Sequence, residues 1–249
     1  MERSVLSGKK IVVTRAKEQA ASLLKRIEEA GGEPIPFPLL SFTEPDDKAA
    51  LKTAICQLSS YDWIVFTSAN GVKFFLKELR DTGGAIRRQK IAAVGKKTAE
   101  LLKKENVKVD CMPKRFEGTE LANELKGIVQ PGERILVPKG NLAKSTILNK
   151  LGDTCEVTEI IVYETNQEVP ESRMISQVET VDVIIFMSPS AVNYFSALGI
   201  SFKKTPLVAC VGPVTEREAY NNGFERVIVA EEYTEEGIIE AICDYFESD

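Results

Sequence analysis

The side chains available for catalysis are limited by one absence, because the sequence contains no histidine. This excludes catalytic triads that use histidine, zinc sites with histidine ligands and acid–base catalysis by imidazole. Catalysis must therefore rest on tyrosine, carboxylates, lysine, hydroxyl groups, backbone amides or the substrate itself. No carboxylates cluster in a way that suggests a metal site, since Asp46-Asp47 is explained as a helix start after Pro45.

Small and hydroxyl-bearing residues recur where short apolar runs end. Six such segments each precede a predicted helix, namely residues 14–15, 67–71, 95–98, 138–141, 188–190 and 212–215. The first amides of a helix have no intrahelical partner and its dipole is positive there. Several such ends in one place would bind a molecule that carries carboxylates or phosphates.

The hydroxyl groups of these turns have two explanations. Ser68, Ser188, Thr98 and Thr215 are either ligand-binding residues or helix N-caps, each worth about 1 kcal/mol of stability. For any single residue the two explanations are equally good. The occurrence of the four in matched pairs favours ligand binding for the set.

Apolar runs rich in β-branched residues alternate with amphipathic segments along the chain, which is typical of parallel sheets with crossover helices. The predicted strands are residues 11–14, 33–37, 63–67, 91–94, 107–111, 134–137, 183–187, 207–211 and 227–230. In open parallel sheets, ligands bind beyond the carboxyl ends of the strands, where the turns described above lie.

Two parts of the chain resemble each other. Residues 62–72 resemble residues 182–192, and residues 92–98 match residues 209–215. The predicted helix at residues 120–125 has its counterpart at 237–242 in the same register. Three matching elements in the same order favour two copies of one architecture.

The copies do not divide the chain at its middle, because the second copy needs two further strands that only the N-terminus supplies. We therefore predict a discontinuous domain of residues 1–37 plus 168–249 and an inserted domain of residues 44–160. The chain crosses between them at residues 38–43 and 161–167. The predicted fold is α/β, with two doubly wound, flavodoxin-like parallel-sheet domains joined by a two-stranded hinge and a cleft between them.

Charge and composition limit the partners and the compartment. The formal net charge of −5 argues against broad nucleic-acid binding but permits a small anionic ligand. No apolar run approaches the roughly 20 residues that span a bilayer, and the first residues lack the apolar core of a secretion signal. The five cysteines are widely spaced without a Cys-x-x-Cys pair, as expected for small buried residues in a reducing compartment. We expect a cytoplasmic monomer that binds neither nucleic acid nor membrane.

Several common motifs are missing. The sequence has no Gly-x-x-x-x-Gly-Lys-Ser/Thr loop, no Gly-x-Gly-x-x-Gly and no Gly-x-Ser-x-Gly elbow. The usual signatures of nucleoside triphosphate binding, dinucleotide binding and α/β-hydrolase catalysis are therefore lacking.

Seven short motifs occur in a fixed order. They are VVTR at 12–15, FTSANGV at 66–72, AVGKKTA at 93–99, LVPKGN at 136–141, VYET at 162–165, SPSAV at 188–192 and VGPVT at 211–215. Each motif alone is weak, but their combined order and spacing resemble the uroporphyrinogen-III synthase family over essentially the whole chain.

The resemblance implies a hydro-lyase of tetrapyrrole and heme biosynthesis that needs no cofactor and no metal. Its substrate is the linear tetrapyrrole hydroxymethylbilane, which loses water and closes to uroporphyrinogen III with ring D inverted through a spiro intermediate. The eight carboxylates of this substrate suit a site built from helix N-termini. A transient contact with the enzyme that makes the substrate is a further expectation.

The resemblance also guides the choice of site residues. Tyr163 is the proposed proton donor to the departing hydroxyl, although a strand tyrosine that packs the hinge explains it nearly as well. Binding of the carboxylates, largely through neighbouring backbone amides and with added charge from Arg15 and Lys139, is assigned to Thr14, Arg15, Ser68, Asn70, Thr98, Lys139, Gly140, Ser188, Ser190 and Thr215.

Three other functions are compatible with parts of the pattern. A non-catalytic sensor would close its cleft on an anionic metabolite, and sequence alone does not separate this from an enzyme. A two-domain glycosyltransferase is weakened by the absence of an Asp-x-Asp metal motif. A phosphoreceiver domain is weaker still, because Thr14-Arg15 stands where an acidic pair is required.

Overall fold

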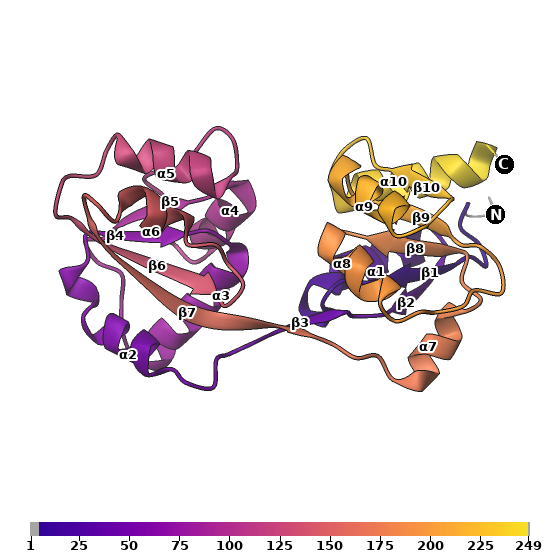
Figure 1. Cartoon of the computed structure of the whole chain (residues 1–249), viewed down its shortest axis with the longest axis horizontal. Coiled ribbons are helices and arrows are strands. Elements are labelled where there is room, and N and C mark those ends of the chain that lie inside the picture. Colours follow the sequence, from indigo (N-terminus) through magenta and orange to yellow (C-terminus); the bar gives the residue numbers. More distant parts are fainter. Residues whose placement is uncertain (1–4, 249) are drawn as a thin grey trace. The chain divides into compact units, whose positions relative to one another are not determined.

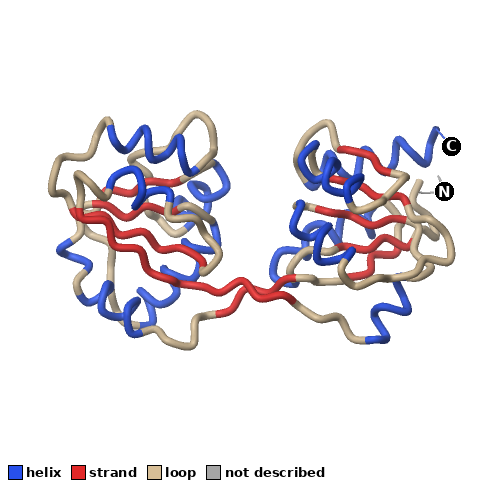
Figure 2. The backbone as a smooth tube through the Cα atoms, in the orientation of Figure 1, coloured by secondary structure: helices blue, strands red, loops and turns tan. Residues whose placement is uncertain are grey.

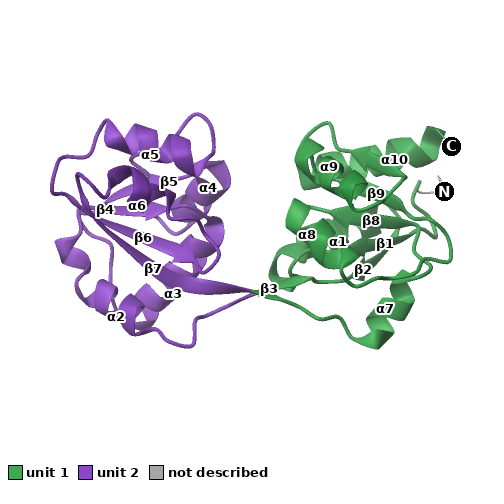
Figure 3. Ribbon diagram, in the orientation of Figure 1, with its two compact units in different colours: residues 1–41, 166–249 green, residues 42–165 purple. Residues whose placement is uncertain are grey.

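A computed structural model describes residues 5–248 of the chain. It divides into two compact units, of which unit 1 comprises Met1–Ser41 and Asn166–Asp249 and unit 2 comprises Phe42–Thr165 (Figure 3). The chain passes from one unit to the other after Ser41 and after Thr165. Both positions lie within the crossings that the sequence predicts.

Unit 1 is a five-stranded sheet with helices on its faces. Its strands are β1 (Lys10–Val13), β2 (Glu33–Pro36), β8 (Val183–Phe186), β9 (Leu207–Cys210) and β10 (Val227–Val229), and its helices are α1 (Lys17–Glu29), α7 (Ser172–Val178), α8 (Pro189–Ser196), α9 (Pro213–Asn221) and α10 (Glu235–Ser248) (Figure 1). The strands lie side by side in the order β10-β9-β8-β1-β2, and all four pairs are parallel. Read from β2, this is the flavodoxin-like order.

Unit 2 has its own five-stranded sheet, in the order β3-β7-β6-β4-β5. Its elements are β3 (Leu40–Thr43), α2 (Ala49–Cys56), a short 3₁₀ helix (Leu58–Ser60), β4 (Trp63–Phe66), α3 (Ala69–Asp81), β5 (Lys90–Ala93), α4 (Lys96–Lys104), α5 (Gly118–Lys126), β6 (Arg134–Gly140), α6 (Thr146–Leu151) and β7 (Glu156–Gln167). The pairs β4–β5, β4–β6 and β6–β7 are parallel.

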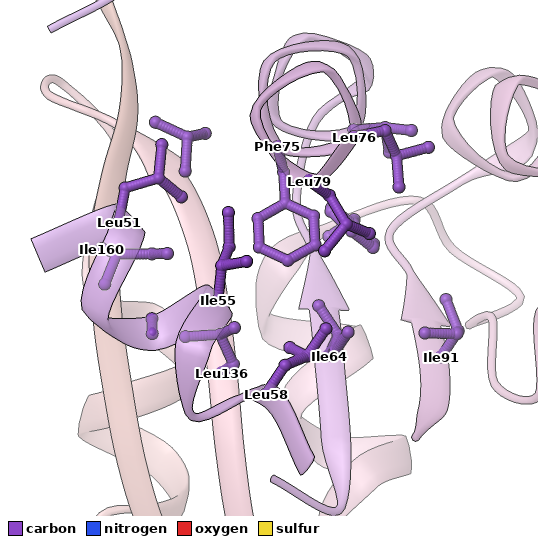
Figure 4. Packing of buried hydrophobic residues seen from close by; sticks show 14 of the residues in the cluster. Leu51, Ile55, Leu58, Ile64, Phe75, Leu76, Leu79, Ile91, Leu136 and Ile160 are labelled. Atoms are coloured by element: carbon purple, nitrogen blue, oxygen red, sulfur yellow. The ribbon is translucent and has the colours of Figure 1, made fainter. Parts of the chain in front are cut away.

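Apolar side chains cover both faces of each sheet, which explains why the strands read as continuous apolar runs. Alternate residues of β4 enter different clusters, with Ile64 on one face and Trp63 on the other. Figure 4 shows the first of these clusters, where Ile55 from α2 and Phe75 from α3 meet Ile64 of the sheet. Two such clusters in each unit give the units separate hydrophobic cores.

Four strands of one sheet correspond to four strands of the other, but with a different chain order. The matched segments place β4 with β8 and β5 with β9, so β6 and β7 occupy the positions of β1 and β2. The registers agree, because Trp63 lies beside Ile135 as Val183 lies beside Ile11. In each unit, the connections that follow two adjacent strands lead toward opposite edges of the sheet. This makes a topological switch point between β1 and β8 and another between β4 and β6.

The predicted strand at residues 107–111 is wrong. This segment lies beside β5 but forms only an isolated bridge between Cys111 and Ala92. The Asp110 carboxylate accepts the Ile91 amide at 2.9 Å, so a side chain takes the place of a ladder carbonyl. Pro113 follows closely and has no amide to continue a ladder.

The strands around the crossings are longer than predicted. β6 extends to Gly140, and the helix expected directly after residues 138–141 begins only at Thr146. β7 runs without interruption from Glu156 to Gln167, and so includes all of the second predicted crossing (Figure 2). β3 forms part of the first crossing and pairs with β7 at the edge of the second sheet.

Between residues 5 and 248, no helix combines the length and the apolar character that crossing a bilayer requires.

Candidate functional site

The carboxyl edge of β4 and β6 brings several predicted residues of unit 2 together. Ser68 is the N-cap of α3, and its hydroxyl accepts the Gly71 amide at 2.9 Å. A Cβ atom at Gly71 would lie 3.0 Å from the Pro138 carbonyl oxygen. Glycine at this position therefore allows the first turn of α3 to lie directly against the end of β6.

Tyr163 lies beside this turn and is 8% exposed. Its ring stacks on Phe74, with centroids 5.6 Å apart, and meets the edge of Phe42 at 5.9 Å. Its hydroxyl lies 3.3 Å from the Ser68 Oγ, and either group can donate. The ring thus packs as a buried strand tyrosine while the hydroxyl reaches the carboxyl edge, so both explanations drawn from the sequence fit the geometry.

Gly140 makes the position of this ring possible. A Cβ atom at Gly140 would lie 2.5 Å from the Tyr163 Cζ atom and 2.8 Å from its hydroxyl oxygen. Any larger residue would displace the ring or the end of β6. Gly140 therefore contributes to the site by letting the Tyr163 ring lie directly against the backbone of β6.

Lys139 points into unit 2, with 7% of its side chain exposed. Its Nζ donates to Glu159 Oε2 at 2.8 Å and to Ser145 Oγ at 2.9 Å. The Glu159 carboxylate thus neutralises the ammonium inside the fold. The expectation that Lys139 adds positive charge to a ligand does not fit this arrangement.

The switch point of unit 1 is held by different side chains. Thr14 is 3% exposed, and its hydroxyl donates to the Ile185 carbonyl at 2.8 Å. It therefore fastens the end of β1 to β8. Arg15 forms an ion pair with Glu235 of α10 and donates to Gln19 at 3.3 Å, so most of its charge is already matched.

Ser188 is the counterpart of Ser68 and is also an N-cap. Its hydroxyl accepts the Ala191 amide at 3.3 Å and lies 3.1 Å from the Ser190 hydroxyl. The backbone angles of the two caps are nearly the same, with φ and ψ of −158° and 154° at Ser68 and −163° and 154° at Ser188. Asn70, in the first turn of α3, is half-buried and engaged in an interaction within the protein.

The two glycine turns match equally well. The N-cap of α4 is Gly95 and that of α9 is Gly212, both in extended backbone. Thr98 and Thr215 are the third helical residues, at 4% and 3% exposure, so the explanation of these two threonines as N-caps is wrong. Their hydroxyls face the fold, and a ligand at these helix starts would meet the backbone amides.

Each unit therefore offers two helix starts at the carboxyl edge of its sheet. The first amides of these helices, the small residues before them and the helix dipoles together favour anionic groups. Within the described residues, no three or more aspartate, glutamate or cysteine side chains are placed to hold a metal ion. Burial, with a smaller effect of Glu216, raises the pKa of the Cys210 thiol to about 12, which makes it a poor nucleophile at neutral pH.

Four residues around this edge were not predicted from the sequence, namely Phe42, Phe74, Ser145 and Glu159. Glu159 carried one signal, since it stands directly before the apolar run at 160–162. Phe42 and Phe74 contact Tyr163 only because segments far apart in the sequence meet in the fold, and no local pattern predicts that contact.

The chain was compared with known proteins. Residues 21–240 match the family model described as uroporphyrinogen-III synthase HemD. A porphyrin biosynthesis protein HemD from Ruminiclostridium josui is 29% identical over 96% of this chain, which spans about half (49%) of that protein. A putative uroporphyrinogen-III synthase from Methanocaldococcus jannaschii is 28% identical, with 94% of this chain and 97% of that protein covered. A uroporphyrinogen-III synthase from Chlorobaculum parvum is 27% identical, with 95% and 98% covered.

Solved structures agree on the fold. A mutant uroporphyrinogen III synthase from the extremely thermophilic bacterium Thermus thermophilus superposes with a TM-score of 0.65 at 15% identity, covering 97% of this chain and 100% of that one. The enzyme from Helicobacter pylori 26695 gives 0.61 at 17% identity, covering 95% and 99%. These structures confirm the predicted two-domain α/β fold with parallel sheets.

Proposed function

The chain belongs to the uroporphyrinogen-III synthase family, lyases of tetrapyrrole biosynthesis, and we propose that it closes hydroxymethylbilane to uroporphyrinogen III with inversion of ring D. The observation that carries this proposal is the duplicated set of helix starts at the carboxyl edges of both sheets. A substrate with eight carboxylates needs many anion-binding positions, and backbone amides at helix starts supply them without a cluster of lysines.

The reaction needs orientation more than strong acids or bases, which suits a chain without histidine. Electron donation from a pyrrole nitrogen breaks the C–O bond of the hydroxymethyl group, and the oxygen leaves as water after protonation. The substituted α-carbon of ring D then attacks the resulting azafulvene to form the spiro intermediate. This fragments and recloses with ring D reversed. Holding two reacting carbons in place is worth about 7–11 kcal/mol in well-oriented reactions.

Without this control, the unsubstituted end of the chain attacks and the uninverted type I isomer forms. The protein must therefore fix the carboxylates of ring D relative to the reacting carbon. We assign the binding of the substrate's carboxylates to the first amides of α3 and α4 in unit 2 and of α8 and α9 in unit 1. The buried hydroxyls of Thr14, Thr98 and Thr215 shape the backbone around them.

Tyr163 is the proposed proton donor to the departing hydroxyl. Its hydroxyl lies at the carboxyl edge beside Ser68, and packing against Phe74 holds the ring in place. A tyrosine hydroxyl fixed in this way can donate a proton to the leaving oxygen as the C–O bond breaks. Ser68 is then positioned to orient that hydroxyl.

The decisive experiment is incubation of the purified protein with hydroxymethylbilane, followed by oxidation and chromatographic separation of the isomers. Type III product, above the amount that forms spontaneously, supports the proposal. Formation of type I product alone would contradict the proposal. Tight binding of a tetrapyrrole without turnover would favour a sensor.

The two crossings, at residues 38–43 and 161–167, are proposed to act as a hinge. The protein is further proposed to work as a cytoplasmic monomer that contacts the preceding enzyme only transiently. Solution scattering with and without product tests the hinge, and sedimentation tests the monomer. An unchanged scattering profile, or a stable dimer, would contradict the respective proposal.

A further inference from the structure

A short loop between β6 and α6 is held unusually firmly for an exposed segment. We call residues 141–145 the tip loop. At its start, the Asn141 amide donates to the Tyr163 carbonyl at 3.2 Å, and the Asn141 Oδ1 accepts the Thr165 amide at 2.9 Å. These two hydrogen bonds fasten the loop to β7, beside the tyrosine of the proposed site.

The other end of the tip loop is held by a buried charged network. Ser145 Oγ donates to Glu159 Oε2 at 2.6 Å and accepts from Lys139 Nζ at 2.9 Å. Lys139 also donates to the same carboxylate oxygen at 2.8 Å, and the two charged side chains are only 7% and 14% exposed. The network therefore ties together β6, β7 and the end of the loop.

Stability alone is a poor explanation for this network. Removing two charges from water is costly, and a well-packed apolar pair often stabilises a protein as much or more. The other carboxylate oxygen, Glu159 Oε1, is buried and has no hydrogen-bond partner among residues 5–248, which adds to the cost. What the network supplies is a fixed position for the tip loop.

The tip loop presents an apolar side chain and a cation to solvent. Leu142 is 67% exposed, and Lys144 is exposed as well. A single exposed leucine on a mobile loop needs no explanation. Here both ends of the loop are fastened, at the carboxyl edge of β6 and hence beside the switch point where ligands bind in such sheets.

We infer that the tip loop is a substrate-binding element, in which Leu142 packs on the face of a pyrrole ring and Lys144 binds one of its carboxylates. Lys139, Glu159 and Ser145 are positioning residues for this loop. The inference rests on the proposed function, because an apolar ring bearing carboxylate arms is the ligand that a neighbouring leucine and lysine recognise.

The binding role is tested with Lys144→Glu and Leu142→Ser, using Lys126→Glu on α5 as the matched control for an exposed lysine. Loss of a charge-assisted contact predicts a rise of about tenfold in KM for Lys144→Glu. Leu142→Ser is expected to raise KM and the fraction of type I product. Both variants should melt at the wild-type temperature, and the control should change none of these values. Wild-type KM in both tip variants would overturn the inference.

The positioning role is tested with Glu159→Gln and Ser145→Ala. Faster hydrogen exchange at amides 141–146, together with a higher KM, is expected for both. The double variant Lys139→Met with Glu159→Leu separates position from stability, because it leaves no unpaired buried charge. It should regain thermal stability but keep the high KM. Recovery of KM along with stability would show that the network only stabilises the fold.

Titration with uroporphyrin III, the oxidised form of the product, separates failure of this inference from failure of the proposed function. If the wild type makes only type I product but binds this porphyrin more tightly than Lys144→Glu does, the tip loop is a binding element and the proposed activity is wrong. Equal binding by both proteins, or none by the wild type, would overturn the tip-loop inference.

Discussion

The carboxyl edges of the two sheets share their backbone but not their side chains. Ser68 and Ser188 cap their helices with backbone angles that differ by no more than about 5°, and Gly95 and Gly212 agree as closely. Around this common backbone, unit 2 places Tyr163 on Gly140, whereas in unit 1 the corresponding strand, β2, ends at Pro36. What the two units have in common is therefore the set of amides that suit anions, and what differs is the set of groups that can do chemistry.

One pair of positions shows how this difference arises. By strand register, Lys139 of β6 corresponds to Arg15, which lies two residues after the end of β1. Lys139 is neutralised from the neighbouring strand by Glu159, and Arg15 from a helix by Glu235. Each unit thus has a cation at the end of the corresponding strand and neutralises it with a carboxylate. The carboxylate comes from a neighbouring strand in unit 2 and from a helix in unit 1. The binding of an anionic ligand then depends mainly on the backbone amides at the helix starts.

Gly140→Ala should have the largest effect of any substitution at these edges. The new Cβ would lie 2.5 Å from the Tyr163 ring, and both residues are buried, so neither can move freely. We expect a loss of about 3 kcal/mol of unfolding free energy, measured by urea denaturation. Gly118→Ala is the control, since its Cβ would meet only Thr146 at an ordinary 3.9 Å. Equal stability of the two variants would contradict the close packing described here.

Tyr163→Phe tests the difference in side chains between the units, because β2, the strand of unit 1 that corresponds to β7, ends at Pro36. Loss of a proton donor predicts a fall of about 100-fold in kcat, with product affinity nearly unchanged. Ser188→Ala, in unit 1, should instead raise KM and lower stability by about 1 kcal/mol through loss of the cap. Steady-state kinetics and product titration measure both. Unchanged turnover in Tyr163→Phe would leave this residue with a packing role only.

Gly71→Ala and Ala191→Gly test whether the two serine turns are interchangeable. A Cβ at Gly71 would lie 3.0 Å from the Pro138 carbonyl oxygen, which is a tight contact, whereas Ala191 occupies the same place in unit 1 with a Cβ already present. We expect Gly71→Ala to cost about 1–3 kcal/mol through steric strain. Ala191→Gly should cost about 1 kcal/mol through helix propensity alone. Similar costs with unchanged kinetics would mean that the close contact in unit 2 relaxes freely.

These contrasts mark the limit of what the sequence could predict. The strands and the turns after them follow from local patterns, so the helix starts at Ser68 and Ser188 were found. The segment at 107–111 has the apolar alternation of a strand, but the Asp110 carboxylate and Pro113 interrupt its ladder. Local patterns also allowed Thr98 and Thr215 to be caps, because they do not show which residue is the last in extended backbone before each helix.

The side-chain environment of the candidate site could not be predicted from the sequence, for a different reason. Gly140 and Tyr163 belong to adjacent strands, and their contact depends on the irregular register at the end of β6. The pairing of Lys139 with Glu159 depends on the same register, 20 residues apart in the sequence. Such contacts are decided by packing of whole elements, which a single sequence does not display.

A last, smaller difference between the units concerns acid stability. In unit 2, Glu44 follows β3 and binds Lys48 at 2.6 Å and Lys77 at 2.5 Å, and these hydrogen bonds lower its pKa from 4.5 to about 2. A carboxyl group with a lowered pKa in the folded state stabilises above its unfolded pKa, and this contribution disappears as pH falls from about 4.5 to about 2. Part of the acid sensitivity of unit 2 should therefore come from this group.

Trp63 is the single tryptophan of the chain and is buried in unit 2, so its fluorescence reports the unfolding of that unit. Urea midpoints followed at Trp63 should fall between pH 5 and pH 3 in the wild type, and should fall less steeply in Glu44→Gln. The effect should be small, because the group is partly exposed to solvent and screened. Glu179→Gln, which removes a long surface ion pair of unit 1, is the control and should leave the Trp63 profile unchanged. Parallel pH profiles for the wild type and Glu44→Gln would remove Glu44 as a source of the difference between the units.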